Sequence, residues 1–186
     1  MSTPFHRLLT FFATRSPRPN TQTITFLDSL RGDLSLGLNF PLALFLALTR
    51  HVVFRNTGFW SLQIHVPTVR TSRVLLGGSG KFDIDEAKRY GVVELVRVVR
   101  GQGGGVTEVL DAVGCWGLVA DRNGMVAGRD VRLYQRGEVM ESVARRRRGR
   151  GDVLPFWRGG PVSVGGHSWA VKRFFDVDVY RDDRKD

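Results

Sequence analysis

The most specific chemical pattern in the chain is a short segment with the spacing of a calcium-binding loop. In the loop of an EF-hand, side-chain oxygens at positions 1, 3, 5 and 12 bind the cation, and glycine at position 6 allows a sharp turn. If Gly124 takes position 6, Asp121 and Asn123 take positions 3 and 5. Asp130 then takes position 12, while Val119 at position 1 has no ligand atom. The segment predicts a turn of EF-hand shape, with Asp121, Asn123 and Asp130 as candidate metal ligands.

A run of arginines around residue 147 could bind anions. Near an anionic membrane each basic side chain adds about 1 kcal/mol of attraction, and the phosphates of nucleic acid attract the same residue type. A solvated charge run without a specific partner is the third interpretation. The candidate basic patch consists of Arg145, Arg146, Arg147, Arg148 and Arg150.

No residue pattern identifies a catalytic centre. The histidines have neither the spacing of a zinc-binding helix motif nor a Ser/His/Asp context that singles one out. Cys115 is the only cysteine, so an intramolecular disulfide is impossible. We interpret it as a small buried side chain, which is the usual state of a free cysteine.

The composition is that of a folded, strongly basic protein. The chain has 186 residues, of which 42% are hydrophobic, enough for one domain with its own core. Lysine and arginine number 28 against 18 acidic residues, which gives a net charge of +10. This excess favours anionic partners, either acidic lipid headgroups or nucleic acid.

One uncharged apolar run, Leu34–Leu48, stands out. A membrane-spanning helix needs about 20 apolar residues, so this run is too short to span. Pro41 is expected to kink or break a helix here. A buried core helix, an interfacial or re-entrant segment and half of a helical hairpin remain as interpretations, and lipid is favoured because leucines crowd both faces. The candidate lipid-associating residues are Leu34, Leu36, Leu38, Phe40, Pro41, Leu42, Leu44, Phe45, Leu46 and Leu48.

The remaining segments are expected to be helices joined by glycine-rich loops. Residues 1–20 contain no aspartate or glutamate, and Pro17 and Pro19 lie close together. This composition predicts a poorly structured, basic N-terminal lead. Apolar spacing predicts helices over Ile84–Val99, Val106–Val119 and Val131–Ala144. Weak alternation predicts a short strand within residues 59–67, and residues 151–186 form a glycine-rich and aromatic tail.

Taken in order, these segments resemble the caleosin family, in particular its shorter fungal members. Leu118–Met140 is similar to the family's C-terminal block. Gly77–Asp83 is similar to a conserved glycine- and serine-rich block, and Thr25–Leu38 to the block that leads into the central hydrophobic segment. The resemblance covers about residues 20–150 and leaves the arginine run and the tail outside the shared core.

The resemblance implies a calcium-binding protein of lipid droplets that uses haem to transfer oxygen from hydroperoxides to unsaturated fatty acids. The family's N-terminal EF-hand corresponds to Pro17–Asp28, where Asp28 is the one remaining ligand. The family's two haem histidines have no ungapped counterpart here, and His6 and His65 are the nearest candidates. Calcium and haem are therefore the cofactors that the resemblance implies.

The sequence predicts a mainly α-helical, EF-hand-derived domain over residues 21–150, with a short hydrophobic membrane-associating segment and few short strands. We expect a divergent caleosin-like protein on the cytosolic surface of lipid droplets or the endoplasmic reticulum, bound to a phospholipid monolayer, with calcium and haem ligands reduced. An active haem peroxygenase is the alternative within the family. A nucleic-acid-binding protein that uses Arg145–Arg150 is the alternative from another class.

Overall fold

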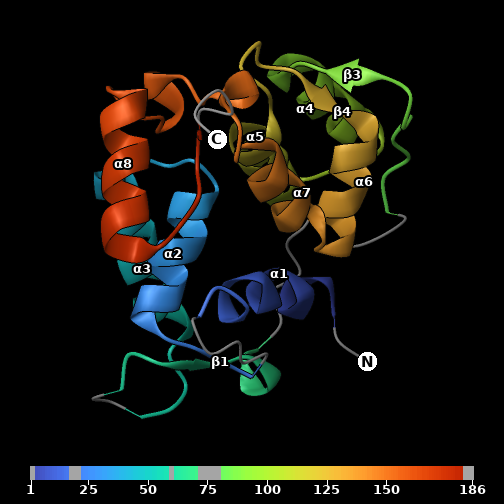
Figure 1. The fold of residues 1–186 in the computed structure, drawn as a ribbon. Helices are drawn as coiled ribbons and strands as arrows, with labels where there is room; N and C mark the ends of the chain where they lie inside the picture. The colour runs from blue at the N-terminus through green and yellow to red at the C-terminus, as the bar shows by residue number, and fades with distance from the viewer. Residues whose placement is uncertain (1–2, 17–21, 59–60, 71–80, 182–186) are drawn as a thin grey trace. The chain divides into compact units, whose positions relative to one another are not determined.

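The computed structural model describes residues 3–16, 22–58, 61–70 and 81–181 (Figure 1). Over these ranges the chain is mainly helical, with eight α-helices and four two-residue strands. The helices are α1 (Pro4–Ala13), α2 (Phe26–Ser35), α3 (Phe40–Phe54), α4 (Val92–Gly101), α5 (Val106–Val119), α6 (Gly128–Arg136), α7 (Val139–Arg146) and α8 (Val164–Phe175). The strands are β1 (Thr23–Ile24), β2 (Ile64–His65), β3 (Arg89–Tyr90) and β4 (Val126–Ala127), and the 3₁₀ turns are η1 (Val66–Thr68), η2 (Arg150–Asp152) and η3 (Phe156–Arg158).

The chain divides into two compact units that differ from the expected domains. Residues 1–8 and 71–142 form one, the central unit, and residues 9–70 and 143–186 form the other, the flanking unit. The expected domain over residues 21–150 is thus divided, and the C-terminal tail belongs with the N-terminal half of the chain. The expected unstructured lead is also corrected, because residues 4–13 form α1.

In the flanking unit, helix caps fix where α2 and α3 begin. The Thr25 hydroxyl and the Asp28 carboxylate exchange hydrogen bonds with each other's backbone N–H groups, which forms a capping box at the start of α2. The Asn39 side chain accepts a bond from the Leu42 N–H at the start of α3. Pro41 lies in the first turn of α3, where its missing donor has no cost, so the expected kink does not occur.

The core of the flanking unit lies where α2, α3 and α8 meet. Small residues of α3 face it, and leucines of α2 and of the connection to α3 fill it. Leu34, Leu36 and Leu38 are almost fully buried in the protein, so these three are corrected from candidate lipid residues to core residues. The cluster comprises Leu30, Leu34, Leu38, Ala43, Ala47, Leu154, Val171, Val179 and Tyr180.

Of the three helices predicted from residue 84 onwards, one is confirmed and two differ in their bounds. The helix predicted over Val106–Val119 is confirmed as α5. The one expected over Ile84–Val99 begins only at Val92, because a loop and β3 come first. The one expected over Val131–Ala144 is interrupted at Gly137, whose φ of +75° ends α6 in the left-handed conformation that glycine adopts without strain.

The short strands form two separate ladders. β1 pairs antiparallel with β2, and β3 pairs antiparallel with β4. Among the described residues of the range 59–67, the expected strand is present as Ile64–His65. Among the described helices, none combines the length and the apolar character that crossing a bilayer requires.

Candidate functional site

The outward face of α3 is largely apolar, with the exposed Thr49 as its one polar side chain. Its buried residues are small or polar, namely Ala43, Ala47 and His51. They are spaced four residues apart, about one helical turn, and therefore lie on one face. The large side chains lie on the opposite face, where Phe45 and Val53 are each 62% exposed. Isolated exposed apolar residues are normal, but a continuous stripe of them marks an interaction site. The stripe consists of Phe40, Leu44, Phe45, Leu48, Val52 and Val53.

Two polar residues of α3 turn inward and leave the stripe uncharged. The Arg50 guanidinium forms two hydrogen bonds of 2.8 and 2.9 Å with the buried Asp33 carboxylate, and it lies 3.7 Å from the centre of the Phe12 ring. The His51 ring is fully buried, 2.8 Å from the Ser29 hydroxyl and bonded to the Leu62 carbonyl. Burial lowers the pKa of His51, so the ring is neutral in the folded protein at neutral pH.

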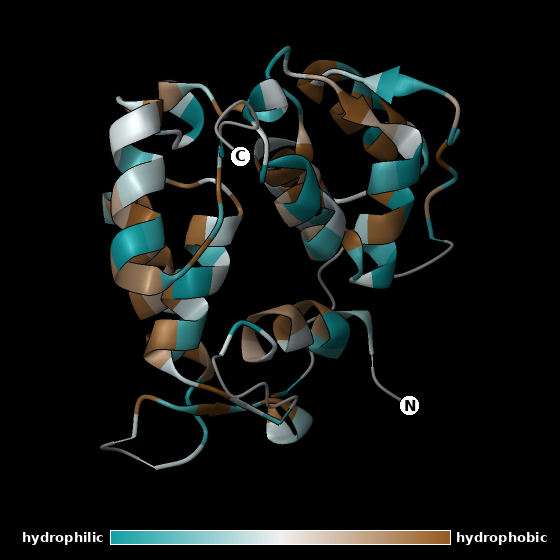
Figure 2. Ribbon diagram, viewed as in Figure 1, coloured by the Kyte–Doolittle hydropathy of each residue, from teal (hydrophilic) through white to brown (hydrophobic). Residues whose placement is uncertain are grey.

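Aromatic residues of the C-terminal segment adjoin the beginning of α3. The Asn39 N–H donates to the Gly159 carbonyl at 2.7 Å, which places the end of η3 beside the α3 cap. The Phe40 and Phe175 rings lie 5.8 Å apart between centroids, so the last turn of α8 also meets α3. Figure 2 shows hydrophobic colour on turns of α3 and on the last turn of α8. The exposed aromatic side chains of η3 and α8 are Phe156, Trp157, Trp169 and Phe174.

The charge around this apolar surface is positive. Residues 34–54 and 153–175 contain no aspartate or glutamate. Arg55 follows α3 and Arg173 lies near the end of α8, both exposed, whereas the neighbouring Lys172 pairs with Asp176 and Asp178. We call α3's stripe together with the aromatic residues of η3 and α8 the apolar surface; its basic margin favours an anionic partner.

The structure divides the candidate lipid residues by burial and adds others. Phe40, Pro41, Leu44, Phe45 and Leu48 are exposed. Leu42 and Leu46 are half-buried against the core. Sequence reasoning missed Val52 and Val53 because Arg50 and His51 ended the uncharged run, and it missed the aromatic residues because they are far away in sequence.

The loop after α5 has the expected turn, but its carboxylates already have partners. The Asp121 carboxylate accepts N–H bonds from Asn123 at 2.8 Å and Met125 at 3.1 Å, and it pairs with Arg89. Asp130 is buried in the first turn of α6. Gly124 has a φ of +74°, as the sharp turn requires. The loop therefore closes through its own hydrogen bonds and an arginine.

A second loop of similar spacing precedes it, and sequence reasoning missed it. Asp83, Asp85 and Glu94 stand at the first, third and twelfth positions of a segment whose eighth residue is Tyr90. Tyr90 pairs with Val126, the eighth residue of the loop after α5, in the β3–β4 ladder. The spacing of the acidic residues could have indicated this loop. Lys88 obscured the pattern, because it occupies the sixth position, where an EF-hand loop has glycine.

Basic side chains pair with the acids of this second loop as well. The Asp83 carboxylate lies 2.7 Å from Arg132, and Glu94 lies 2.6 Å from Lys88. Calcium requires six or more oxygen ligands, whereas the described residues contain no group of three side chains that could hold a metal. Three of these loop carboxylates, those of Asp83, Glu94 and Asp121, pair with the protein's own cations, so this ligand set does not fit calcium.

The flanking unit contains the matching ladder and the last candidate calcium ligand. Ile24 pairs with Ile64 between β1 and β2. The Asp28 carboxylate accepts the Thr25 N–H at 2.9 Å and the Thr25 hydroxyl at 2.7 Å, so it caps α2. Residues 17–21, which hold most of the expected N-terminal calcium loop, lie outside the described residues.

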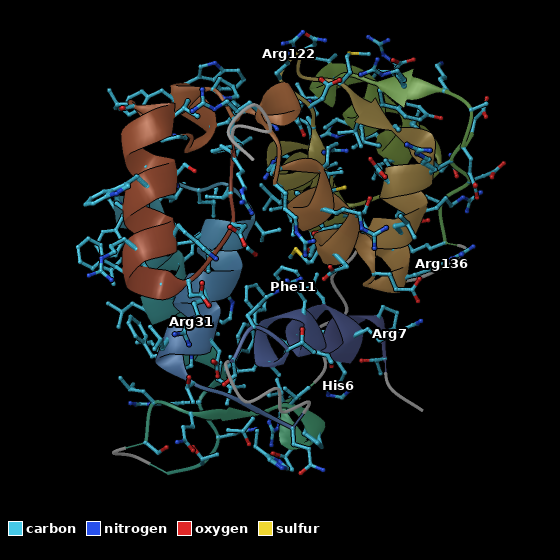
Figure 3. All side chains as sticks on the ribbon, in the orientation of Figure 1. His6, Arg7, Phe11, Arg31, Arg122 and Arg136 are labelled. Carbon is cyan, nitrogen blue, oxygen red and sulfur yellow. The ribbon has the colours of Figure 1, made fainter. Side chains whose placement is uncertain are left out.

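The two candidate haem histidines belong to different units, and each has a local neighbour. His6 lies on α1, with its Nδ1 3.3 Å from the Thr3 hydroxyl (Figure 3). His65 lies on β2 in the flanking unit, with its Nδ1 3.2 Å from the Thr68 hydroxyl. Both contacts involve Nδ1 and leave Nε2, the other possible ligand atom, uninvolved, so they neither support nor oppose axial ligation of haem.

The arginine run does not form a single solvated patch. Arg147 is fully buried, donates to the Leu36 carbonyl, and has its pKa lowered to about 10 by burial. Arg146 pairs with Asp152 at 2.5 Å, and the Arg150 Nε donates to the Tyr180 carbonyl at 3.3 Å. The candidate basic patch is thereby corrected, because Arg147 is part of the core and Arg146 is partly buried against Asp152, which leaves Arg145, Arg148 and Arg150 exposed.

Comparisons with known proteins identify no relative of this chain. No family model, no curated protein and no solved structure matches the chain. Function must therefore be inferred from the geometry and charge described above.

Proposed function

We propose that this protein binds peripherally to a lipid surface, such as a lipid droplet or the cytosolic face of the endoplasmic reticulum, through its apolar surface. The observation that carries the proposal is the outward stripe of α3, in which six large apolar side chains face water while alanines face the core. Burying such a side chain stabilises by about 1.5–3 kcal/mol. A stripe of this size is therefore a strong driving force for association.

The length of α3 favours binding at a lipid surface over spanning the membrane. α3 has 15 residues, so its length is about 22 Å, shorter than the roughly 30 Å hydrocarbon core. An apolar helix face of this kind lies in the plane of the interface. The exposed Trp157 and Trp169 are the residue type that prefers the headgroup level, and the basic margin favours anionic headgroups.

The two ladders support the proposal that the chain is a divergent, EF-hand-derived protein of caleosin type. In each unit a two-residue antiparallel ladder ties two loops that helices flank, as paired EF-hand loops are tied. We further propose that calcium is not needed for the central unit's loops, since Arg89, Arg132 and Lys88 already neutralise their carboxylates. The proposal does not include haem chemistry, because no observation on His6 or His65 indicates a haem site.

Flotation with phosphatidylcholine vesicles and with triacylglycerol droplets tests the lipid proposal. The variant Phe45→Asn/Val53→Asn places polar groups on the stripe without touching the core, and we expect the protein to stay in the soluble fraction. The matched control is Val106→Asn/Leu110→Asn, which changes two equally exposed residues of α5 in the central unit. The control should float like the unchanged protein.

Two results would overturn the proposal. One is flotation of the α3 variant at the level of the unchanged protein. The other is an equal loss in both variants, which would indicate general stickiness instead of a defined surface. Far-ultraviolet circular dichroism and melting temperature of each variant establish that the fold is retained.

A further inference from the structure

The flanking unit contains a cavity of about 620 Å³ with an unusually basic lining. Pockets for small organic ligands have volumes of about 300–1,000 Å³. The loop after α1, α2, the end of α7 and the segment after α8 all contribute to its wall, with three hydroxyl side chains among them. The charged residues that line it are Arg15, Arg31, Arg148, Arg181, Asp176 and Asp178.

Positive charge dominates the cavity. Four arginines outnumber two aspartates, and Lys172 already binds both acids, at 2.7 Å from Asp176 and 3.3 Å from Asp178. Arg148 is exposed at the cavity wall and has no acidic partner among the described residues. The cavity is therefore complementary to an anion.

One arginine of the cavity is held in position by the end of α8. The Arg31 Nε donates to the Phe175 carbonyl at 3.1 Å, and Figure 3 shows Arg31 on α2 beside the segment that follows α8. Phe175 itself lines the cavity, and its ring packs against Phe40, the first residue of the apolar stripe. The cavity and the apolar surface thus share a residue.

We propose that this cavity binds a phosphate ester. A planar guanidinium donates two parallel hydrogen bonds to a phosphate, and several arginines together neutralise a dianion. The volume exceeds that of inorganic phosphate and leaves room for the alcohol portion of the ester. A phospholipid headgroup and a free phosphate ester share this chemistry; the headgroup as source rests on the proposed lipid-surface function, whereas phosphate binding itself rests on the cavity alone.

Isothermal titration of the full-length protein with glycerol 3-phosphate tests the cavity directly. The variant Arg148→Gln removes a cavity cation whose side chain makes no structural bond among the described residues. The matched control is Arg145→Gln, which removes the same charge from an exposed residue of the same run outside the cavity lining. We expect binding about tenfold weaker in Arg148→Gln, equivalent to about 1.4 kcal/mol, because a charge-assisted hydrogen bond to the phosphate is lost, and we expect unchanged binding in Arg145→Gln.

Vesicles separate the two sources of phosphate. If a headgroup is the ligand, adding phosphatidic acid to phosphatidylcholine vesicles strengthens binding of the unchanged protein and of Arg145→Gln more than that of Arg148→Gln. Equal strengthening in all three, together with selective loss of glycerol 3-phosphate binding in Arg148→Gln, assigns the cavity to a free ester.

The cavity proposal and the lipid proposal fail in different ways. No titration heat with glycerol 3-phosphate, or equal weakening in Arg148→Gln and Arg145→Gln, overturns the cavity. Salt-sensitive binding to an oligonucleotide that both variants weaken equally would point to a diffuse basic surface and also overturn it. Loss of flotation on neutral vesicles with intact titration would overturn only the lipid proposal.

Discussion

In the flanking unit and in the central unit alike, a two-residue antiparallel ladder joins two loops, but the two units treat their side chains differently. The flanking unit pairs charges in its interior, with Arg50 on Asp33 and Arg147 in the core, and exposes large apolar residues along the length of α3. The central unit also buries acids and exposes some apolar residues on α5, but the acids of its loops pair with lysine and arginine at partly exposed positions. The same local plan thus supports an apolar binding surface in one unit and self-neutralised loops in the other.

The largest expected effect separates the core leucines from the exposed ones. Leu34 is fully buried in the flanking unit, whereas Leu48 on α3 is 48% exposed. We expect Leu34→Ala to lower the free energy of unfolding by about 2.7–5 kcal/mol, because it leaves a cavity in the core. Leu48→Ala should change it by less than about 0.5 kcal/mol. Urea denaturation measures both, and equal losses would contradict the assignment of inner and outer residues.

The second prediction compares ion pairs between the units. Removing Arg50 leaves the Asp33 carboxylate buried without its partner, which costs about 3–5 kcal/mol. We expect Arg50→Met to be strongly destabilising in the same denaturation experiment. Lys88→Met removes an exposed pair with Glu94 in the central unit and should leave the melting temperature nearly unchanged. Comparable losses of stability in Arg50→Met and Lys88→Met would contradict the proposed difference between the two units.

The third prediction concerns pH and the buried histidine of the flanking unit. Burial lowers the pKa of His51, Arg50 lowers it further, and the Leu62 carbonyl and Asp28 act in the opposite direction. The unfolded chain therefore takes up a proton at higher pH than the folded one does. Stability is full above the unfolded pKa of about 6.5 and declines as the pH falls through that value towards the lower folded pKa.

Melting temperatures between neutral and mildly acidic pH measure this decline. His51→Gln should flatten the profile in this window while it lowers stability at neutral pH. His167, whose pKa is also lowered by burial, contributes in the same direction, so His51→Gln/His167→Gln is the matched comparison. If both variants kept the same dependence of melting temperature on pH, the two histidines would not be the cause of the decline.

The smallest expected effect is that of calcium on the central unit. Since Arg89, Arg132 and Lys88 pair with the loop carboxylates, we expect the melting temperature to be the same with calcium as with a chelator. Differential scanning calorimetry on the full chain measures it. A clear calcium-dependent rise would show that the cation displaces the basic side chains.

The sequence predicted those features that depend on local spacing. The bounds of α5 and the turn at Gly124 followed from apolar periodicity and from the position of a glycine. The burial of Leu34–Leu38 could not be predicted, because the apolar run crosses the left-handed Gly37, whose φ is +80°. Its first part therefore belongs to α2 and its second to α3, with different surroundings.

Long-range contacts account for the rest. Phe175 of α8 meets Phe40 of α3, and Asn39 bonds to Gly160, in each case more than 100 residues apart in the chain. The inward turn of Arg50 depends on Asp33 and Phe12, which no local pattern connects. The cavity draws its arginines from four separate segments, so the arginine run alone could not indicate it.

Site-specific fluorescence tests the lipid-facing role of α3 most directly. Burial and the nearby Asp111 carboxylate hold the pKa of the Cys115 thiol well above its ordinary value, so an environment-sensitive thiol reagent will label an introduced exposed cysteine selectively. On phosphatidylcholine vesicles, we expect a blue-shifted emission from the label at Phe45→Cys on α3 and an unchanged emission from the label at Leu110→Cys on α5. An unchanged spectrum at Phe45→Cys, or an equal shift at both positions, would contradict the account.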